Sequence, residues 1–362
     1  MTTHRIKASV IGAGWYAAQS HIPTLASRSD VVLDGVCRLG AAELQRVRDH
    51  FGFVFGSENY HDVLARKPDV VVIASPHNKH FEHCQAALAG GAHVLCEKPM
   101  TLDPAQAWAL VAQAQRAGLS LVLANGYHYL PGLAQVRQAL IDGAVGRIEH
   151  VSCSFVSATR AVFEGDVGLA RWSSMFFRPA RDTWQDPANG GGFAYGQLSH
   201  SVALTLWLTG LDALSVSAHN FNVDGNDLCN AASVLCANGS VLSLSGAAAL
   251  PEGQRALLRL FITGNEGVME LELDRDRVSL SRHDGENRLP LNISPGQWNY
   301  HCEGPIHAVV DLAQGRGSNL TPGAIGAATV SVIAALAASS KNGGNAVAVV
   351  QAASSSSPAG SP

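Results

Sequence analysis

Hydrophobic residues in the first third of the chain form short runs, separated by segments with helical spacing. The runs cover residues 8–12, 31–36, 69–75, 93–97 and 119–124. Before the last run, Asp103 and Pro104 form a helix-start signal, and Gly118 marks the expected helix end. Continuous apolar strands that alternate with helices are typical of a parallel sheet covered on both faces. We therefore expect an α/β fold that begins with a doubly wound, nucleotide-binding domain over residues 1–128.

The pattern changes after residue 146, where strictly alternating segments replace the continuous ones. In residues 147–157, Val151, Cys153 and Phe155 share one face, and serines occupy the other. Further strand-like runs follow at 213–221, 229–236, 240–248, 256–263 and 267–273, and helices are expected at 197–209 and 322–339. This arrangement predicts a second α/β domain over residues 129–350 with a large, mostly antiparallel open sheet. The serine-rich residues 351–362 are predicted to form a disordered tail.

Composition narrows the class of protein. The chain has 362 residues, 15% of them charged, and a formal net charge of −4. Because neither sign of charge dominates, we expect no nucleic-acid partner and no membrane partner. We count no apolar run of the ~18 residues that a transmembrane helix needs, and no secretory signal at the N-terminus. Seven cysteines without a CxxC pair fit unpaired thiols and a cytoplasmic location.

The first predicted strand leads into a glycine loop. In such a loop the first glycine permits a tight turn, and the second lets the backbone approach a pyrophosphate at the helix N-terminus. This context, strand before and helix after, predicts a dinucleotide site. The cofactor-binding residues expected from the loop are Gly12, Ala13, Gly14, Trp15 and Tyr16.

The end of the second strand leaves the cofactor open between NAD and NADP. An acid that binds the adenosine ribose is expected there, but Asp34 lies part-way along the strand and Arg38 stands at its tip. Arg38 could accept the 2′-phosphate of NADP, or stack flat on the adenine of NAD. The chemistry of an arginine at this position favours NADP slightly.

Lys98 is the strongest candidate for acid–base chemistry. It is one of five lysines and follows an apolar strand, at the edge of a parallel sheet where ligands bind. Partial burial and a neighbouring cationic nicotinamide would both lower its pKa from ~10.4. Such a group suits proton transfer to and from a sugar hydroxyl while hydride moves to the cofactor. The alternative is an exposed lysine that pairs with Glu97.

Three further sequence segments follow the glycine loop in an order that is typical of one protein family. They are Ala74-Ser75-Pro76-His77-Asn78-Lys79-His80, then Glu97-Lys98-Pro99, then Gly190-Gly191-Gly192 leading to His200 and Trp207-Leu208-Thr209-Gly210. With the glycine loop, this order resembles the glucose–fructose oxidoreductase / inositol dehydrogenase (Gfo/Idh/MocA) family over about residues 6–345. The resemblance implies a Rossmann domain, then an α/β domain whose open sheet supports a homodimer or homotetramer. It also implies oxidation or reduction of a sugar or cyclitol hydroxyl with NAD(P).

The resemblance also implies a set of site residues. Further cofactor contacts are Ser75, Pro76, His77, His80, Glu97, Lys98 and Asn125, and the catalytic residues are Lys98, His200 and Tyr195. One departure matters: the family's aspartate, four residues before the histidine, is Gly196 here. His200 therefore lacks the carboxylate that would orient it and raise its basicity. Tyr195 and Gln197 flank the missing group and could bind substrate.

Several residues are expected to bind a polar ring. The segment 171–186 is rich in arginine and tryptophan, which suit stacking on sugar faces and hydrogen bonding to hydroxyls. The predicted substrate contacts are Lys98, Tyr127, His128, Arg178, Trp184, Tyr195, Gln197 and His200. No metal is expected, because no histidine pairs at ligand spacing with a cysteine or acid cluster.

Three functions are compatible with these residues. The first is a sugar, glycoside or cyclitol dehydrogenase or reductase with Lys98 as acid and base. The second is an NAD-dependent, redox-neutral glycoside hydrolase that oxidises C3 transiently and eliminates the aglycone, as some relatives do. The third is a non-catalytic cofactor-binding regulator, which the presence of both Lys98 and His200 disfavours.

Overall fold

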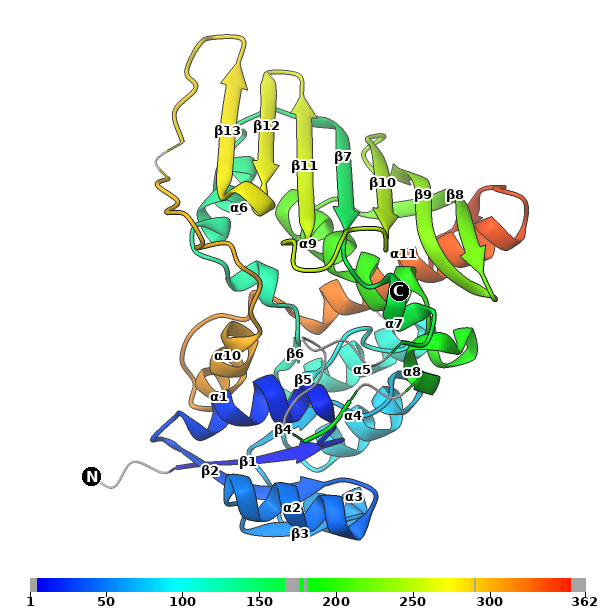
Figure 1. Cartoon of the computed structure of the whole chain (residues 1–362). Helices are drawn as coiled ribbons and strands as arrows, with labels where there is room; N and C mark the ends of the chain where they lie inside the picture. Colours follow the sequence, from blue (N-terminus) through cyan, green and yellow to red (C-terminus); the bar gives the residue numbers. More distant parts are fainter. Residues whose placement is uncertain (1–4, 167–175, 179–180, 290, 353–362) are drawn as a thin grey trace, which may run out of the picture.

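The computed structural model describes residues 5–166, 176–178, 181–289 and 291–352, and it contains two sheets (Figure 1). The first is a six-stranded parallel sheet in the order β3-β2-β1-β4-β5-β6. Five of its strands coincide with the predicted apolar runs, and the short edge strand β3 was not predicted. The strands are β1 (Ile6–Ile11), β2 (Val31–Cys37), β3 (Phe55–Ser57), β4 (Val70–Ile73), β5 (His93–Cys96) and β6 (Leu121–Leu123). The doubly wound domain is confirmed.

Helices cover both faces of this sheet, and local signals explain where they begin and end. Asp103 caps α5 by accepting a hydrogen bond from the Ala105 amide, and Gly118 ends it in the left-handed conformation that favours glycine. The α-helices of this domain are α1 (Ile22–Ala26), α2 (Ala41–Phe51), α3 (Tyr60–Leu64), α4 (His80–Ala89) and α5 (Pro104–Ala117). The turn η3 (Gly126–Tyr129) spans the predicted domain boundary at residue 128.

The second sheet has eight strands in the order β13-β12-β11-β7-β10-β9-β8-β14. Only β7 and β10 pair in parallel; the other described pairs are antiparallel, as the alternating pattern predicted. Strands β13 and β14 were not predicted. The bounds are β7 (Ile148–Val156), β8 (Ala213–Val223), β9 (Asn226–Cys236), β10 (Val241–Ala247), β11 (Leu257–Gly264), β12 (Gly267–Glu272), β13 (Arg277–Arg282) and β14 (Val347–Ala348).

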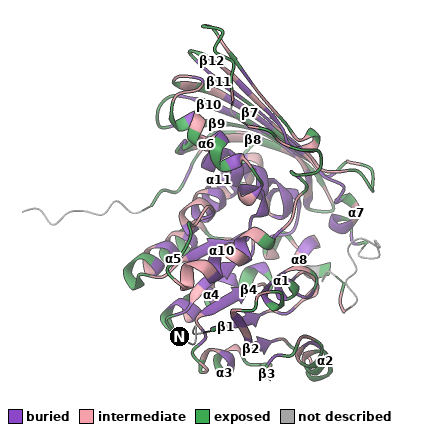
Figure 2. Ribbon diagram, turned by 90° about the vertical axis from the view of Figure 1, so that its left-hand side faces the viewer, coloured by how far each residue is buried: buried purple, intermediate pink, exposed green. Residues whose placement is uncertain are grey.

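Helices pack on one face of this sheet, and the other face is exposed (Figure 2). The packed face carries alternate apolar residues such as Val151, Cys153 and Phe155, which are buried. They share one core with side chains of α6 (Leu133–Ile141), α9 (Ser199–Thr209) and α11 (Gly323–Lys341). The exposed face carries serines together with the large side chains of Leu235, Val241 and Phe261.

Helix α11 corrects one expectation from the sequence. An 18-residue window within its 19 residues has a mean hydropathy of 1.7, so by length and composition it could cross a membrane, although no such run was predicted. Because alanine, serine and threonine separate its larger apolar residues, the segment was not counted as one apolar run. In the structure 61% of that window is buried, and the helix packs against β8, α5 and α9. It is therefore a core helix of this fold.

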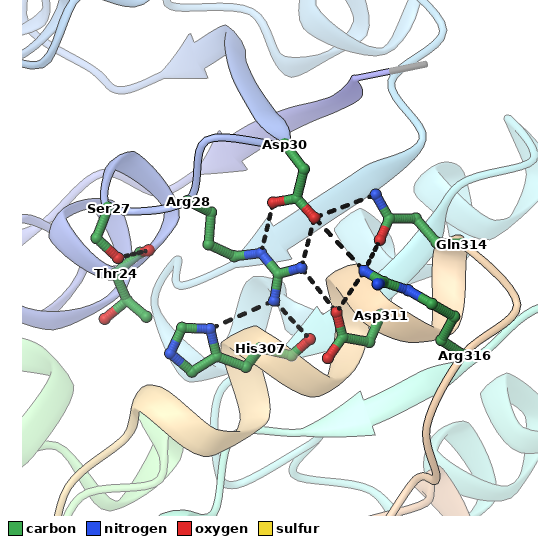
Figure 3. Close-up of polar contacts among 8 residues, drawn as sticks. All are labelled: Thr24, Ser27, Arg28, Asp30, His307, Asp311, Gln314 and Arg316. Atoms are coloured by element: carbon green, nitrogen blue, oxygen red, sulfur yellow. Dashed lines mark hydrogen bonds and ion pairs between the residues drawn. The ribbon is translucent and has the colours of Figure 1, made fainter. Parts of the chain in front are cut away.

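Helix α10 (Glu303–Ala313), which was not predicted, returns to the first domain beside α1 (Figure 1). Its Ile306, Val309 and Val310 are buried in the same core as β1 and β2. An ion network fixes its far end, as Figure 3 shows: the guanidinium of Arg28 bridges Asp30 and Asp311 at 2.8 and 2.7 Å. The parallel sheet thus depends on residues from near the end of the chain.

Candidate active site

A cleft with a cavity volume of about 1350 Å³ runs along the carboxyl ends of the parallel strands and continues to the second sheet. Its first part is lined by the glycine loop and by the segments that follow β2, β4 and β5. Its second part is lined by residues of β7, η6 (Ala194–Leu198), α9 and the segment before α10, together with Phe177, Arg178, Thr183 and Trp184. This position, outside the carboxyl ends of parallel strands, is where open α/β sheets bind ligands.

The glycine loop can hold a pyrophosphate. Gly12 has a φ of +85°, and a Cβ there would lie 2.3 Å from Ser75 Cα, so a side chain would displace the segment that follows β4. Gly14 has only the Gly12 carbonyl, at 3.8 Å, within 4 Å of an added Cβ, so its surface is open to a ligand. Of the loop residues predicted to bind cofactor, Gly12, Gly14, Trp15 and Tyr16 line the cleft. A dinucleotide therefore fits the backbone here.

At the adenosine end, Arg38 also lines the cleft, and its contacts are defined. Its Nη1 donates to the Ala13 carbonyl at 3.1 Å, and its Cζ lies 3.5 Å from the centroid of the Phe177 ring. Asp34 does not face the cofactor, because it is buried and accepts two hydrogen bonds from the Arg66 guanidinium at 2.9 and 2.7 Å. Asp34 of β2 therefore forms a structural ion pair with Arg66.

The segment after β4 forms the next part of the wall. Ser75, Pro76, His77 and His80, which are predicted to contact the cofactor, all line the cleft. The His80 ring lies between two carbonyl oxygens, 2.8 Å from each, and so joins the loop after β4, at Ser75, to the loop after β5, at Pro99. Burial lowers the pKa of His77 well below its usual value, and its ring lies 5.5 Å from that of Trp184. Both histidines shape this wall.

Lys98 lies at the centre of the cleft, directly after β5. Its Nζ donates to the carbonyl of Gly196 at 2.7 Å and lies 5.5 Å from the Trp184 ring centroid. Burial lowers the pKa of Lys98, against the opposing influence of Glu97. Glu97 is not an exposed partner of this lysine. It is buried in the wall of the cleft, where its Oε1 accepts from His21 Nε2 at 2.7 Å and its Oε2 accepts from the Lys98 amide at 3.0 Å.

The structure gives a steric reason for the missing aspartate. Gly196 lies in the π-helical turn η6, and a Cβ at this position would be 3.0 Å from two carbons of the Phe163 ring and 3.2 Å from Trp184. Phe163 and Trp184 are both buried. Aromatic rings therefore occupy the space of an acidic side chain, and the main-chain carbonyl of Gly196 holds Lys98 instead.

His200 lines the cleft one helical turn further on, in an aromatic surround. Its ring lies 5.2 Å from Tyr300 and 5.8 Å from Tyr127, and its Nδ1 lies 3.4 Å from the Asn125 Oδ1. Burial, together with the nearby Lys98, lowers the pKa of His200 well below its usual value. The histidine is therefore neutral, and an amide rather than a carboxylate orients it.

Some site residues were not recognised from the sequence. The segment before α10 contributes Tyr300, His301 and Cys302, and the second domain adds Ser157, Thr159 and Gln254. The Tyr300 hydroxyl lies 3.0 Å from Cys302 Sγ, and burial raises the pKa of the Cys302 thiol to about 11. No sequence motif surrounds Tyr300, His301 and Cys302. They reach the cleft because α10, which follows them, returns to the first domain.

Four predicted residues are not among the described residues that line the cleft. Asn125 lies behind His200, and His128 is buried with its ring against Trp207 and its Nε2 3.3 Å from the Ala203 carbonyl. The Tyr195 hydroxyl donates to the Leu102 carbonyl at 3.4 Å, away from Lys98, and Ala13 contributes its carbonyl to Arg38. In this structure these four residues contact other residues of the site, and their direct contacts with cofactor or substrate stay predictions.

The remaining predicted substrate contacts do line the cleft. They are Tyr127, Arg178, Trp184 and Gln197, with Arg178 exposed at the rim. Residues 171–175 and 179–180 of the arginine- and tryptophan-rich segment lie outside the described residues, as do residues 353–362 of the predicted tail. Within the part of the chain that the structure describes, no three histidine, cysteine, aspartate or glutamate residues converge to hold a metal ion.

Comparison with known proteins adds independent information. D-glucoside 3-dehydrogenase of Escherichia coli is 30% identical over 62% of this chain and 60% of its own length. D-apiose dehydrogenase of Paraburkholderia graminis is 27% identical over 82% of this chain and 75% of its own length. The solved structure of levoglucosan dehydrogenase with NADH and levoglucosan superposes with a TM-score of 0.75, covering 96% of this chain and all of its own, at 18% identity. That structure supports the fold alone.

Family models match both parts of the chain. Residues 6–125 match the oxidoreductase family with an NAD-binding Rossmann fold, and residues 133–270 match the GFO/IDH/MocA C-terminal domain. The two matches follow each other in the order of the two sheets, and the fold of both sheets agrees with them. The chain therefore belongs to the Gfo/Idh/MocA family of oxidoreductases.

Proposed function

We propose that this protein is an NAD(P)-dependent dehydrogenase that oxidises a secondary hydroxyl of a sugar, glycoside or cyclitol, or reduces the corresponding ketone. The observation that carries the proposal is the half-buried Lys98, whose amine is held by the Gly196 carbonyl within the dinucleotide cleft. The names of the relatives, which are sugar dehydrogenases, support the substrate class.

The proposed chemistry divides between the cofactor and the protein. When bound, the nicotinamide supplies a hydride acceptor. The chain must then take up the proton of the substrate hydroxyl, and the neutral form of the Lys98 amine accepts it at Nζ. Since burial lowers the pKa of Lys98, more of the lysine is in this neutral form near neutral pH than for an exposed lysine. In the reverse direction the ammonium returns the proton to the ketone oxygen.

Other side chains hold the ring and exclude water. Neutral His200 can hydrogen-bond a substrate oxygen next to Lys98, while Asn125 fixes its ring. Trp184 presents an aromatic face on which an apolar sugar face can stack. The hydroxyl groups of Ser157 and Thr159, 2.8 Å apart, and the amide of Gln254 are suited to further ring hydroxyls.

A single assay with two readouts tests the proposal. Purified protein is given NAD or NADP with free sugars, cyclitols and aryl glycosides, and both reduced cofactor and released aglycone are followed. We expect reduced cofactor to accumulate. The K98M variant should lose about 10²- to 10⁴-fold in turnover while it still binds cofactor. K341M, which changes an exposed lysine at the end of α11, is the matched control.

Other outcomes would contradict the dehydrogenase. Release of aglycone that requires the cofactor but leaves it oxidised would assign the redox-neutral glycosidase instead. Cofactor binding without turnover of any substrate, and without isotope exchange from any sugar, would assign the non-catalytic regulator. Full turnover by K98M would remove Lys98 from the mechanism.

A further inference from the structure

The tip of β2 determines whether a Rossmann domain selects NAD or NADP. NAD selection requires an acid that binds the adenosine ribose hydroxyls, and NADP selection requires a cation for the 2′-phosphate. Here Cys37 and Arg38 stand at the end of β2, so the strand supplies no acid at this point. By this criterion alone the site would favour NADP, and the structure offers two observations against that interpretation.

The first observation is that the Arg38 guanidinium already has two contacts. One amino group donates to the Ala13 carbonyl in the glycine loop at 3.1 Å, and one face lies 3.5 Å from the Phe177 ring centroid. A bidentate contact with a phosphate requires the edge of the guanidinium to face the ligand. An arginine tied to the glycine loop and stacked on a phenylalanine is less available for that contact.

The second observation is a carboxylate on the neighbouring strand. In the sheet, Ser57 of β3 pairs with Cys37 of β2, so the next residue, Glu58, lies level with Arg38. The Glu58 carboxylate accepts a hydrogen bond from the Gly40 amide, which fixes it at the turn that follows β2, and it lines the cleft. An acid is therefore present where β2 lacks one.

The other charges at this end do not offset that carboxylate. Lys79 lines the cleft but pairs with Glu82 at 3.2 Å. Burial lowers the pKa of His83 to about 4, so this histidine is neutral. Leu39, also in the lining, is 78% exposed and offers an apolar surface to an adenine ring. The surroundings suit an uncharged ribose better than a phosphate dianion.

We propose that Glu58 binds the ribose hydroxyls of the adenosine and makes this cleft selective for NAD over NADP. The carboxylate replaces, from β3, the acid that β2 lacks, and it repels a 2′-phosphate. The inference rests on the dinucleotide cleft of the proposed function, but it does not depend on the sugar that is oxidised.

The test is equilibrium binding, measured by calorimetry with NAD and with NADP on the full chain without substrate. We expect the wild-type protein to bind NAD at least about tenfold more tightly, and E58Q to lose most of that ratio through weaker NAD binding. E58R should reverse the preference. E286Q is the control, since Glu286 is an exposed glutamate that is not among the described lining residues, and it should keep the wild-type ratio.

Two results would overturn the proposal. One is tighter binding of NADP than of NAD by the wild-type protein, and the other is an unchanged ratio in E58Q whose melting temperature equals that of wild type. Because Glu58 is exposed, the exchange to glutamine should leave the fold intact. A protein that binds NAD selectively but oxidises no sugar would disprove the proposed function and leave this inference standing.

Discussion

Replacement of Gly196 by alanine tests the steric explanation for the missing aspartate. Gly196 lies in a helical turn, and its φ is not in the left-handed region, so helix propensity alone predicts that alanine stabilises the protein by roughly 0.5–1 kcal/mol. The structure predicts the opposite sign. The added methyl group would lie 3.0 Å from the Phe163 ring and 3.2 Å from Trp184, and both rings are buried and cannot easily move.

The expected magnitude follows from these opposing effects. Overpacking of a filled core costs roughly 1–3 kcal/mol, from which the helix gain is subtracted. The net destabilisation is then about 1 kcal/mol, which lowers the melting temperature by about 1 °C in a chain of this size. Calorimetry of G196A against wild type measures this shift.

A second variant separates crowding from other effects. In the F163L background the ring that the methyl group meets is removed, so the further change to G196A should be neutral or stabilising there. The reasoning is refuted if G196A alone melts above wild type, or if F163L leaves the cost of G196A unchanged. In either case the absence of the aspartate would need an explanation other than the aromatic rings.

Three further predictions concern the rest of the molecule. R28A should destabilise the protein by about 1 kcal/mol, because Asp30 and Asp311 lose their shared partner, whose side chain is only 12% exposed. Melting temperatures in low and high salt measure how far salt screens this ion pair. The Arg255 guanidinium and the amides of Gly296 and Trp298 hold the pKa of Asp276 well below its usual value. The stability that this gives is present above about pH 4 and is lost as the pH falls further. In D276N the free energy of unfolding should therefore fall less steeply between about pH 5 and 2, which denaturant unfolding at a series of pH values measures. The exposed face of the eight-stranded sheet should join copies into a dimer or tetramer, so light scattering should report a multiple of the chain mass that F261R reduces, and a monomeric wild type would contradict this.

The sequence was informative wherever function and fold depend on local signals. Continuous apolar runs located five strands of the parallel sheet, and alternation located most of the antiparallel one. The glycine loop and Lys98 were found because short motifs at strand ends carry the chemistry of this fold. Both signals are local, so a single sequence contains them.

The sequence was uninformative where long-range packing decides. Tyr300 and Cys302 have no motif and reach the cleft only through α10, which was itself missed. His128 and Asn125 follow β6 at the expected edge, but tertiary packing directs them toward α9 and not into the cleft. Whether Arg38 is available for a phosphate also depends on Phe177, far along the chain. Such contacts cannot be read from spacing.

The return of α10 to the parallel sheet has a consequence for the synthesis of the chain. The nucleotide-binding half emerges first from a ribosome, yet part of its core is supplied by Ile306, Val309 and Val310. Until those residues have been translated, the apolar surface beneath them near α1 stays open to water or to a chaperone. A nascent chain arrested before residue 303 should therefore remain sensitive to protease, although every strand of the parallel sheet has been made, and protection should come only once α10 has left the exit tunnel.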